Sequence, residues 1–134
     1  MRLDPASIKS VEERVITLAA AIEAGTGLIL TLQPSALVWL LLGAELSQAG
    51  DALGRIAGFA LLALAWACWP RREGAGRRTA APLALLIYNL LTTIYLAYLG
   101  IGKELVGMLL WPAVGIHAVL LIILVSTWFF RPTS

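Results

Sequence analysis

The stretch that decides the fold is VITLAAAIEAGTGLILTL at residues 15–32, in which Glu23 is the only charged side chain. An α-helix needs about 20 predominantly apolar residues to cross the hydrocarbon core of a bilayer. Comparable apolar runs follow at residues 52–69, 81–101 and 105–130. We therefore predict an all-α protein with one domain over residues 1–134, built as a bundle of four transmembrane helices.

The overall composition supports a membrane protein. Of the 134 residues, 60% are hydrophobic and 13% are charged, about half the charged share of a typical soluble domain. The net charge is +2, but the arginines lie beside apolar runs, as topology signals do, so nucleic-acid binding is not predicted. Cys68 is the single cysteine, which excludes an intramolecular disulfide and argues against a thiol-redox enzyme.

A shorter apolar run separates the first two spans. Pro34 interrupts the helical pattern, and residues 36–42 are too few to cross a bilayer. We predict a short interfacial or re-entrant helix here, with Trp39 at the level of the lipid headgroups. A short surface helix is expected to lead into the first span, and Pro112 is expected to kink the last one.

Lysine and arginine are distributed unevenly over the connecting segments. The loop between the second and third spans is basic and both terminal tails add positive charge, whereas the opposite side has only Lys103 and Arg55. Because cytoplasmic loops are rich in Lys and Arg, we predict cytoplasmic termini and a bacterial-type inner (plasma) membrane. The loop residues that set this topology, with anionic lipid binding as a secondary effect, are Arg71, Arg72, Arg77 and Arg78.

Small residues mark the helix faces that are expected to pack. Helices associate in a bilayer where small side chains let their backbones approach closely. The second span has a ridge of such residues, and the first and fourth spans have others. We predict that the first two spans pack together within one chain, with dimerisation as the alternative. The glycines concerned are Gly25, Gly50, Gly54, Gly58 and Gly115.

Four polar side chains within the spans need an explanation, because ionisable groups are costly in a bilayer and tend to face the bundle interior. Glu23 lies about nine residues into the first span, Asn89 and His117 lie at comparable depth, and Arg55 enters from the outer end. We predict that these four meet, with Tyr95 continuing the polar side of the third span. Two interpretations stay open: a proton-coupled or ligand-binding site, and a structural cluster that fixes the helix register.

Other chemistries have weaker support. A metal site needs three or four converging ligands, and a haem bound by His117 would lack a second axial ligand of the usual type, so no metal or cofactor is predicted. Tyr88, Tyr95 and Tyr98 fall at helical spacing in the third span. Such a stripe is more typical of packing and of anchoring at the membrane interface than of a quinone site.

The segment LGRIAGFALLALA at residues 53–65 resembles the second helix of the DoxX-like superfamily of small four-helix membrane proteins. The break at Pro34 and the pair Leu42-Gly43 fit the same pattern. The resemblance implies the four-helix fold. Some members of that superfamily are subunits or helpers of redox enzymes, and others look like chaperones for larger membrane proteins. The resemblance transfers no catalytic residue.

Three functions are compatible with these features. The first expectation is a non-enzymatic accessory or interaction subunit, in contact with the lipid bilayer and with a larger membrane protein complex or a second copy. The second is a small proton-coupled carrier that uses Glu23 and His117 and works as a homodimer. The third is a lipid- or quinone-binding redox subunit, with a pocket that opens toward lipid near Tyr95 and His117.

Overall fold

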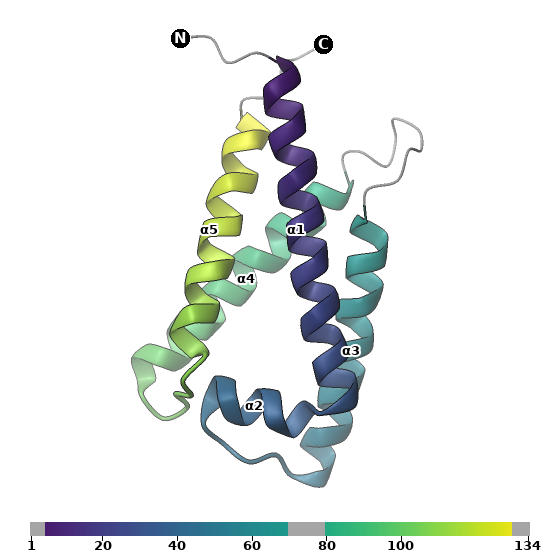
Figure 1. The fold of residues 1–134 in the computed structure, drawn as a ribbon. Helices are drawn as coiled ribbons and strands as arrows, with labels where there is room; N and C mark the ends of the chain where they lie inside the picture. The colour runs from purple at the N-terminus through teal and green to yellow at the C-terminus, as the bar shows by residue number, and fades with distance from the viewer. Residues whose placement is uncertain (1–4, 70–79, 130–134) are drawn as a thin grey trace.

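Four long helices and one short helix make up the described part of the protein. The structure is a computed structural model, and it describes residues 5–69 and 80–129. All helices except the second are long and apolar enough to cross a membrane. The predicted all-α fold is therefore confirmed, and the protein is a multipass membrane protein. The helices are α1 (Pro5–Leu32), α2 (Pro34–Leu42), α3 (Gln48–Cys68), α4 (Ala80–Gly102) and α5 (Leu110–Phe129) (Figure 1).

The junction between α1 and α2 is a single residue, Gln33. A proline disfavours the helical conformation at the residue before it, and Gln33 has a φ of -141° and a ψ of 60°. Pro34 then begins α2, where a helix needs no N–H donor. α2 ends at Gly43, which has a left-handed φ of 68° and donates its N–H to the Trp39 carbonyl oxygen at 2.8 Å. The chain therefore turns sharply, and α2 lies across the end of the bundle opposite the termini (Figure 1).

Two helices begin earlier than the hydropathy pattern predicts. The surface helix expected before the first span is continuous with that span, so that α1 runs without a break from Pro5. α3 begins at Gln48 rather than near residue 52, because Ser47 caps it. The Ser47 hydroxyl accepts a hydrogen bond from the Gly50 N–H at 3.1 Å, which satisfies one of the free donors of the first turn.

The last span begins later than predicted, at Leu110 rather than near residue 105. Residues just before it turn toward α2 instead: the Gly107 and Leu109 N–H groups donate to the Leu41 and Leu40 carbonyl oxygens at 3.0 and 2.9 Å. Pro112 consequently falls in the first turn of α5, where the helix needs no N–H donor. The predicted kink at Pro112 within the span is therefore wrong.

The helices pair as two hairpins. α1 packs most extensively against α3, as predicted for the first two spans, and α4 packs most extensively against α5. The hairpins come together near the chain termini and diverge toward α2 (Figure 1). We refer to the end of the bundle near the termini as the terminal side and to the opposite end as the α2 side.

An apolar core joins the two hairpins on the terminal side. Each spanning helix contributes to it, so this is the level at which all four pack together. Small residues come from α1, a thiol from α3 and leucines from α4 and α5. The buried members of this terminal core are Val15, Ala19, Ala20, Cys68, Leu85, Leu120 and Leu124.

Glycines create the closest approach of α1 and α3. A Cβ atom at Gly58 would lie 2.7 Å from the Gly27 carbonyl oxygen, and one at Gly27 would lie 2.9 Å from the Gly58 carbonyl oxygen. Gly54 lies against Pro34, whereas Gly50 has only Leu46 and Ser47 nearby. The structure thus supports the predicted contact with α1 for Gly58, whereas Gly54 packs against α2.

Gly25 and Gly115 do not pack within the chain. Both are exposed, and a Cβ atom added to either would meet no atom within 4 Å. The prediction that they contribute to packing within one chain is therefore wrong. Spacing alone could not show this, because Gly25 and Gly27 are neighbours in sequence but lie on different faces of α1.

Candidate functional site

Glu23 points into the bundle and is fully buried. It shares the inward face of α1 with Ala19, Ala20 and Gly27, which are also buried, because residues three, four and seven positions apart lie on one side of a helix. It precedes the end of α1 by nine residues, which is about 14 Å at 1.5 Å per residue. The carboxyl group is therefore deep within the spanning segment.

The carboxyl group of Glu23 has no hydrogen-bond partner. Neither of its oxygen atoms bonds to any residue in the described ranges 5–69 and 80–129. The Tyr88 hydroxyl from α4 lies next to the Glu23 carboxyl group without reaching hydrogen-bond geometry. The Cys68 thiol from α3 is close enough for an electrostatic interaction with this carboxyl group. An unsatisfied buried polar group costs free energy, so this carboxyl group needs an explanation beyond packing.

Asn89 and His117 form a well-defined pair between α4 and α5. The Asn89 side-chain nitrogen donates to the Leu85 carbonyl oxygen at 2.8 Å, and its Oδ1 atom lies 2.9 Å from the His117 Nδ1 atom. A carbonyl oxygen only accepts, so the first bond fixes the orientation of the amide. Oδ1 also only accepts, so Nδ1 must carry a proton. A neutral His117 therefore has its lone pair on Nε2.

Tyr88 connects this pair to Glu23. The Tyr88 and His117 rings meet edge to face, with their centroids 5.8 Å apart and an interplanar angle of 75°. The structure thus brings together three of the four predicted residues, with Asn89 and His117 in direct contact and Glu23 reached through Tyr88. We call Glu23, Tyr88, Asn89 and His117 the buried polar cluster.

Sequence reasoning missed the role of Tyr88. The helical spacing of Tyr88, Tyr95 and Tyr98 suggested one stripe of equivalent residues, yet Tyr95 is 62% exposed and Tyr98 is 70% exposed. Tyr95 therefore does not belong to the buried polar cluster. The hairpins diverge toward the α2 side (Figure 1), so a face of α4 that is interior at Tyr88 becomes exposed farther along. No signal in the sequence distinguishes the three tyrosines.

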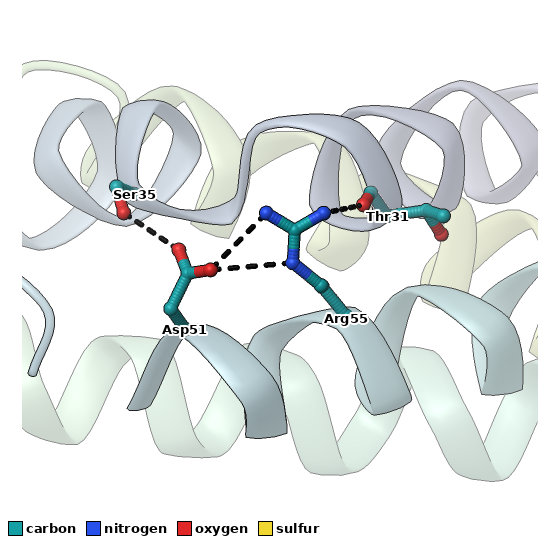
Figure 2. A network of polar contacts seen from close by, with 4 residues as sticks. All are labelled: Thr31, Ser35, Asp51 and Arg55. Carbon is teal, nitrogen blue, oxygen red and sulfur yellow. Dashed lines mark hydrogen bonds and ion pairs between the residues drawn. The ribbon is translucent and has the colours of Figure 1, made fainter. Parts of the chain in front are cut away.

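Arg55 does not join the buried polar cluster, contrary to prediction. Its guanidinium group donates twice to the Asp51 Oδ2 atom, at 3.2 Å each, and once to the Thr31 carbonyl oxygen at 2.8 Å (Figure 2). Asp51 in turn accepts a hydrogen bond from the Ser35 hydroxyl at 2.8 Å. Asp51 lies one helical turn before Arg55, where opposite charges pair readily, and Thr31 has one of the free carbonyl groups at the end of α1.

This second polar network connects α1, α2 and α3 by hydrogen bonds on the α2 side. Ser35 belongs to α2, Asp51 and Arg55 belong to α3, and Thr31 belongs to α1, so three helices are connected where α1 turns into α2 (Figure 2). The Arg55 side chain is 46% exposed. Exposed ion pairs of this kind contribute little to stability, and their effect here is to fix local geometry.

The remaining predictions concern metal ligands and the residues that set the topology. Within residues 5–69 and 80–129, no group of three or more His, Cys, Asp or Glu side chains is arranged to hold a metal ion. The predicted topology residues Arg71, Arg72, Arg77 and Arg78 lie outside the described residues, so that prediction stays as it was.

Comparisons with protein-family models, with curated proteins and with solved structures find no match. The resemblance to the DoxX-like superfamily therefore rests on the segment at residues 53–65 and the break at Pro34.

Proposed function

We propose that this protein carries out a proton-coupled step in the membrane, as a small carrier in which Glu23 gains and loses the proton. The observation that supports the proposal is the fully buried carboxyl group without a hydrogen-bond partner among the described residues. A purely structural cluster satisfies its donors and acceptors, as the hydrogen bond between the His117 Nδ1 and Asn89 Oδ1 atoms does. Ionisable groups within spanning helices often mark proton and substrate pathways.

The neighbours of Glu23 suit proton exchange. The Tyr88 hydroxyl can donate to a carboxylate or accept from a carboxylic acid, so it can serve either form of Glu23. His117 lies against the Tyr88 ring, and its Nε2 atom can accept a proton because Nδ1 already donates to Asn89. The buried polar cluster therefore combines Glu23, which gains and loses a proton, with Tyr88 and His117, whose hydrogen-bonding groups can adjust to either form.

An accessory role is the second candidate, and one observation favours it. Gly25 and Gly115 leave open space on exposed faces of α1 and α5, and such positions allow another helix to approach closely. A larger membrane protein or a second copy of this chain could occupy them. Four spans are few for a carrier, so the carrier proposal also calls for a homodimer.

We further propose that the protein resides in a bacterial-type inner membrane with its terminal side in the cytoplasm. The support is the excess of Lys and Arg in the loop after α3 and in the two tails. Membership of the DoxX-like superfamily is likewise a proposal, and it is compatible with either candidate function.

Infrared difference spectroscopy of the protein in lipid bilayers tests the proton-coupled role. We expect a carboxylic-acid C=O band at acid pH that is lost reversibly at alkaline pH and is missing in Glu23→Gln. Glu13→Gln is the matched control, because Glu13 is an exposed glutamate on the same helix. A wild-type spectrum with no band that depends on Glu23 and on pH contradicts the proposal and favours the accessory role.

A further inference from the structure

We infer that the ligand exchanged against the proton at Glu23 is a lipophilic ammonium ion. By this we mean a monovalent organic cation with at least one N–H group and an apolar substituent. The inference rests on the proton-coupled function proposed above and names the class of substrate that the same site would take.

The charge of the site requires a cation. When Glu23 releases its proton, a negative charge remains in a buried position, and such a charge is costly unless it is paired. The Arg55 guanidinium group is held by Asp51 and by the Thr31 carbonyl oxygen on the α2 side. Among residues 5–69 and 80–129, no basic group bonds to the Glu23 carboxyl group, and a bound cation would supply the compensating charge.

The hydrogen-bonding groups favour a ligand with N–H donors. A carboxylate offers only acceptors, and both Glu23 oxygen atoms are unused. The Asn89 contact leaves the lone pair of neutral His117 on Nε2. An anion would meet acceptors only, and a quaternary ammonium ion could not donate to them.

The surroundings of the buried polar cluster favour an apolar substituent on the ligand. The terminal core lies on the terminal side of the buried polar cluster in every spanning helix: Ala20 precedes Glu23, Leu85 precedes Asn89 and Leu120 follows His117. This core closes the path toward the termini with aliphatic side chains.

Toward the α2 side, close contacts lie within each hairpin, and the segment before α5 is also bonded to α2 across the end of the bundle. A Cβ atom at Gly58 would meet Gly27 across the seam of α1 and α3, and one at Gly100 would meet Leu110 across the seam of α4 and α5. The hairpins themselves diverge in this direction (Figure 1). The buried polar cluster is thus bordered by apolar packing, which suits a ligand with an apolar substituent.

The exchange is balanced in charge and protons. The ammonium ion binds to the carboxylate, and the Glu23 proton leaves to water, so one positive charge enters for each proton released. The titratable groups that face Glu23 are Cys68 from α3, Tyr88 from α4 and, beyond Tyr88, His117 from α5. α2 contains no titratable side chain.

Isothermal titration of the full chain in phosphatidylcholine nanodiscs, with octylammonium as the probe, tests the inference. Titration in two buffers of different protonation enthalpy counts the protons, and empty nanodiscs correct for partition into lipid. We expect saturable binding with release of one proton for each cation, and an apparent affinity that rises about tenfold per pH unit while Glu23 is protonated. Octanoate should not bind saturably, and octyltrimethylammonium should bind more weakly.

Variants assign the effect to Glu23. Glu23→Gln should lose both the saturable binding and the proton release, and Glu13→Gln should keep both. If octanoate binds as well as octylammonium, or if folded Glu23→Gln binds unchanged, the inference is wrong. If Glu23→Gln fails to fold, the wild-type proton count and the comparison of the three probes still decide.

The infrared titration separates the two proposals. If Glu23 titrates but octylammonium releases no proton, the proton-coupled role stands and the ligand class is wrong. If Glu23 does not titrate, the proton-coupled role itself fails.

Discussion

Replacing Gly58 by alanine should weaken the packing of α1 against α3. A Cβ atom at this position would lie 2.6 Å from the Thr31 hydroxyl oxygen and 2.7 Å from both the Gly27 carbonyl oxygen and the Thr31 backbone nitrogen. Two of these three atoms belong to the backbone of α1 and cannot rotate away. The helices would have to separate by roughly 0.7 Å to restore ordinary contact, which begins at 3.4 Å.

The expected magnitude follows from two opposing effects. Overpacking of a tight contact costs about 1–3 kcal/mol, whereas replacing glycine by alanine within a helix favours folding by roughly 0.5–1 kcal/mol. The difference spans about 0–2.5 kcal/mol. Because two of the three close atoms belong to the backbone, we expect Gly58→Ala to lower the free energy of unfolding by about 1–2 kcal/mol, a factor of roughly 5–30 in the folded-to-unfolded ratio. Gly27→Ala should cost less, because its nearest atoms lie at 2.9 and 3.0 Å.

Reversible unfolding in mixed micelles, followed by circular dichroism, measures this difference. Gly25→Ala is the matched control on α1, since a Cβ atom there meets nothing within 4 Å. It should be neutral or stabilising by up to roughly 1 kcal/mol. The expected order of stability is Gly25→Ala, then Gly27→Ala, then Gly58→Ala. Equal stability of Gly58→Ala and Gly25→Ala would refute the inferred contact between α1 and α3.

Three further changes test other parts of the structure. Asn89→Leu removes the acceptor of the His117 Nδ1–H group, so nitrogen NMR should show a larger share of the tautomer protonated on Nε2. The free energy of unfolding should fall by about 1–3 kcal/mol. An unchanged tautomer ratio contradicts the assigned bond. Arg55→Ala should destabilise less than Gly58→Ala in the same unfolding assay, because the ion pair with Asp51 is exposed; a larger effect contradicts that ranking. Gly43→Ala should lower the free energy of unfolding by about 1–3 kcal/mol, because only glycine adopts the left-handed φ of 68° freely. Unchanged thermal unfolding of this variant counts against that turn.

The membrane-spanning helices could be predicted from the sequence because their signal is local. An apolar run of sufficient length, such as residues 15–32, crosses a bilayer stably as a helix, because a helix satisfies its own backbone hydrogen bonds. The short helix after Pro34 follows from the same count of apolar residues. The helix ends were less predictable. Residues 105–109 are as apolar as the span they precede, and only their backbone bonds to Leu40 and Leu41 keep them out of α5.

The positions of the polar side chains could also be predicted only in part from the sequence. Depth along a helix can be counted from the sequence, so Glu23, Asn89 and His117 were correctly expected near one level. The direction in which a long side chain extends depends on its local partners, and Arg55 turns toward Asp51 and Thr31 rather than toward Glu23. The divergence of the hairpins, which buries Tyr88 more than Tyr95, arises from packing across the whole bundle.

The most direct test of the account is a carbon–carbon correlation measured by solid-state NMR in lipid bilayers. The measurement asks whether the Glu23 carboxyl carbon and the Tyr88 ring carbon that bears the hydroxyl lie within contact distance. The account predicts a cross-peak between these two atoms, together with a Glu23 carboxyl shift that changes with pH. A Glu23 signal that correlates with lipid acyl chains and not with Tyr88 would place the carboxyl group outside the bundle and contradict the proposed site.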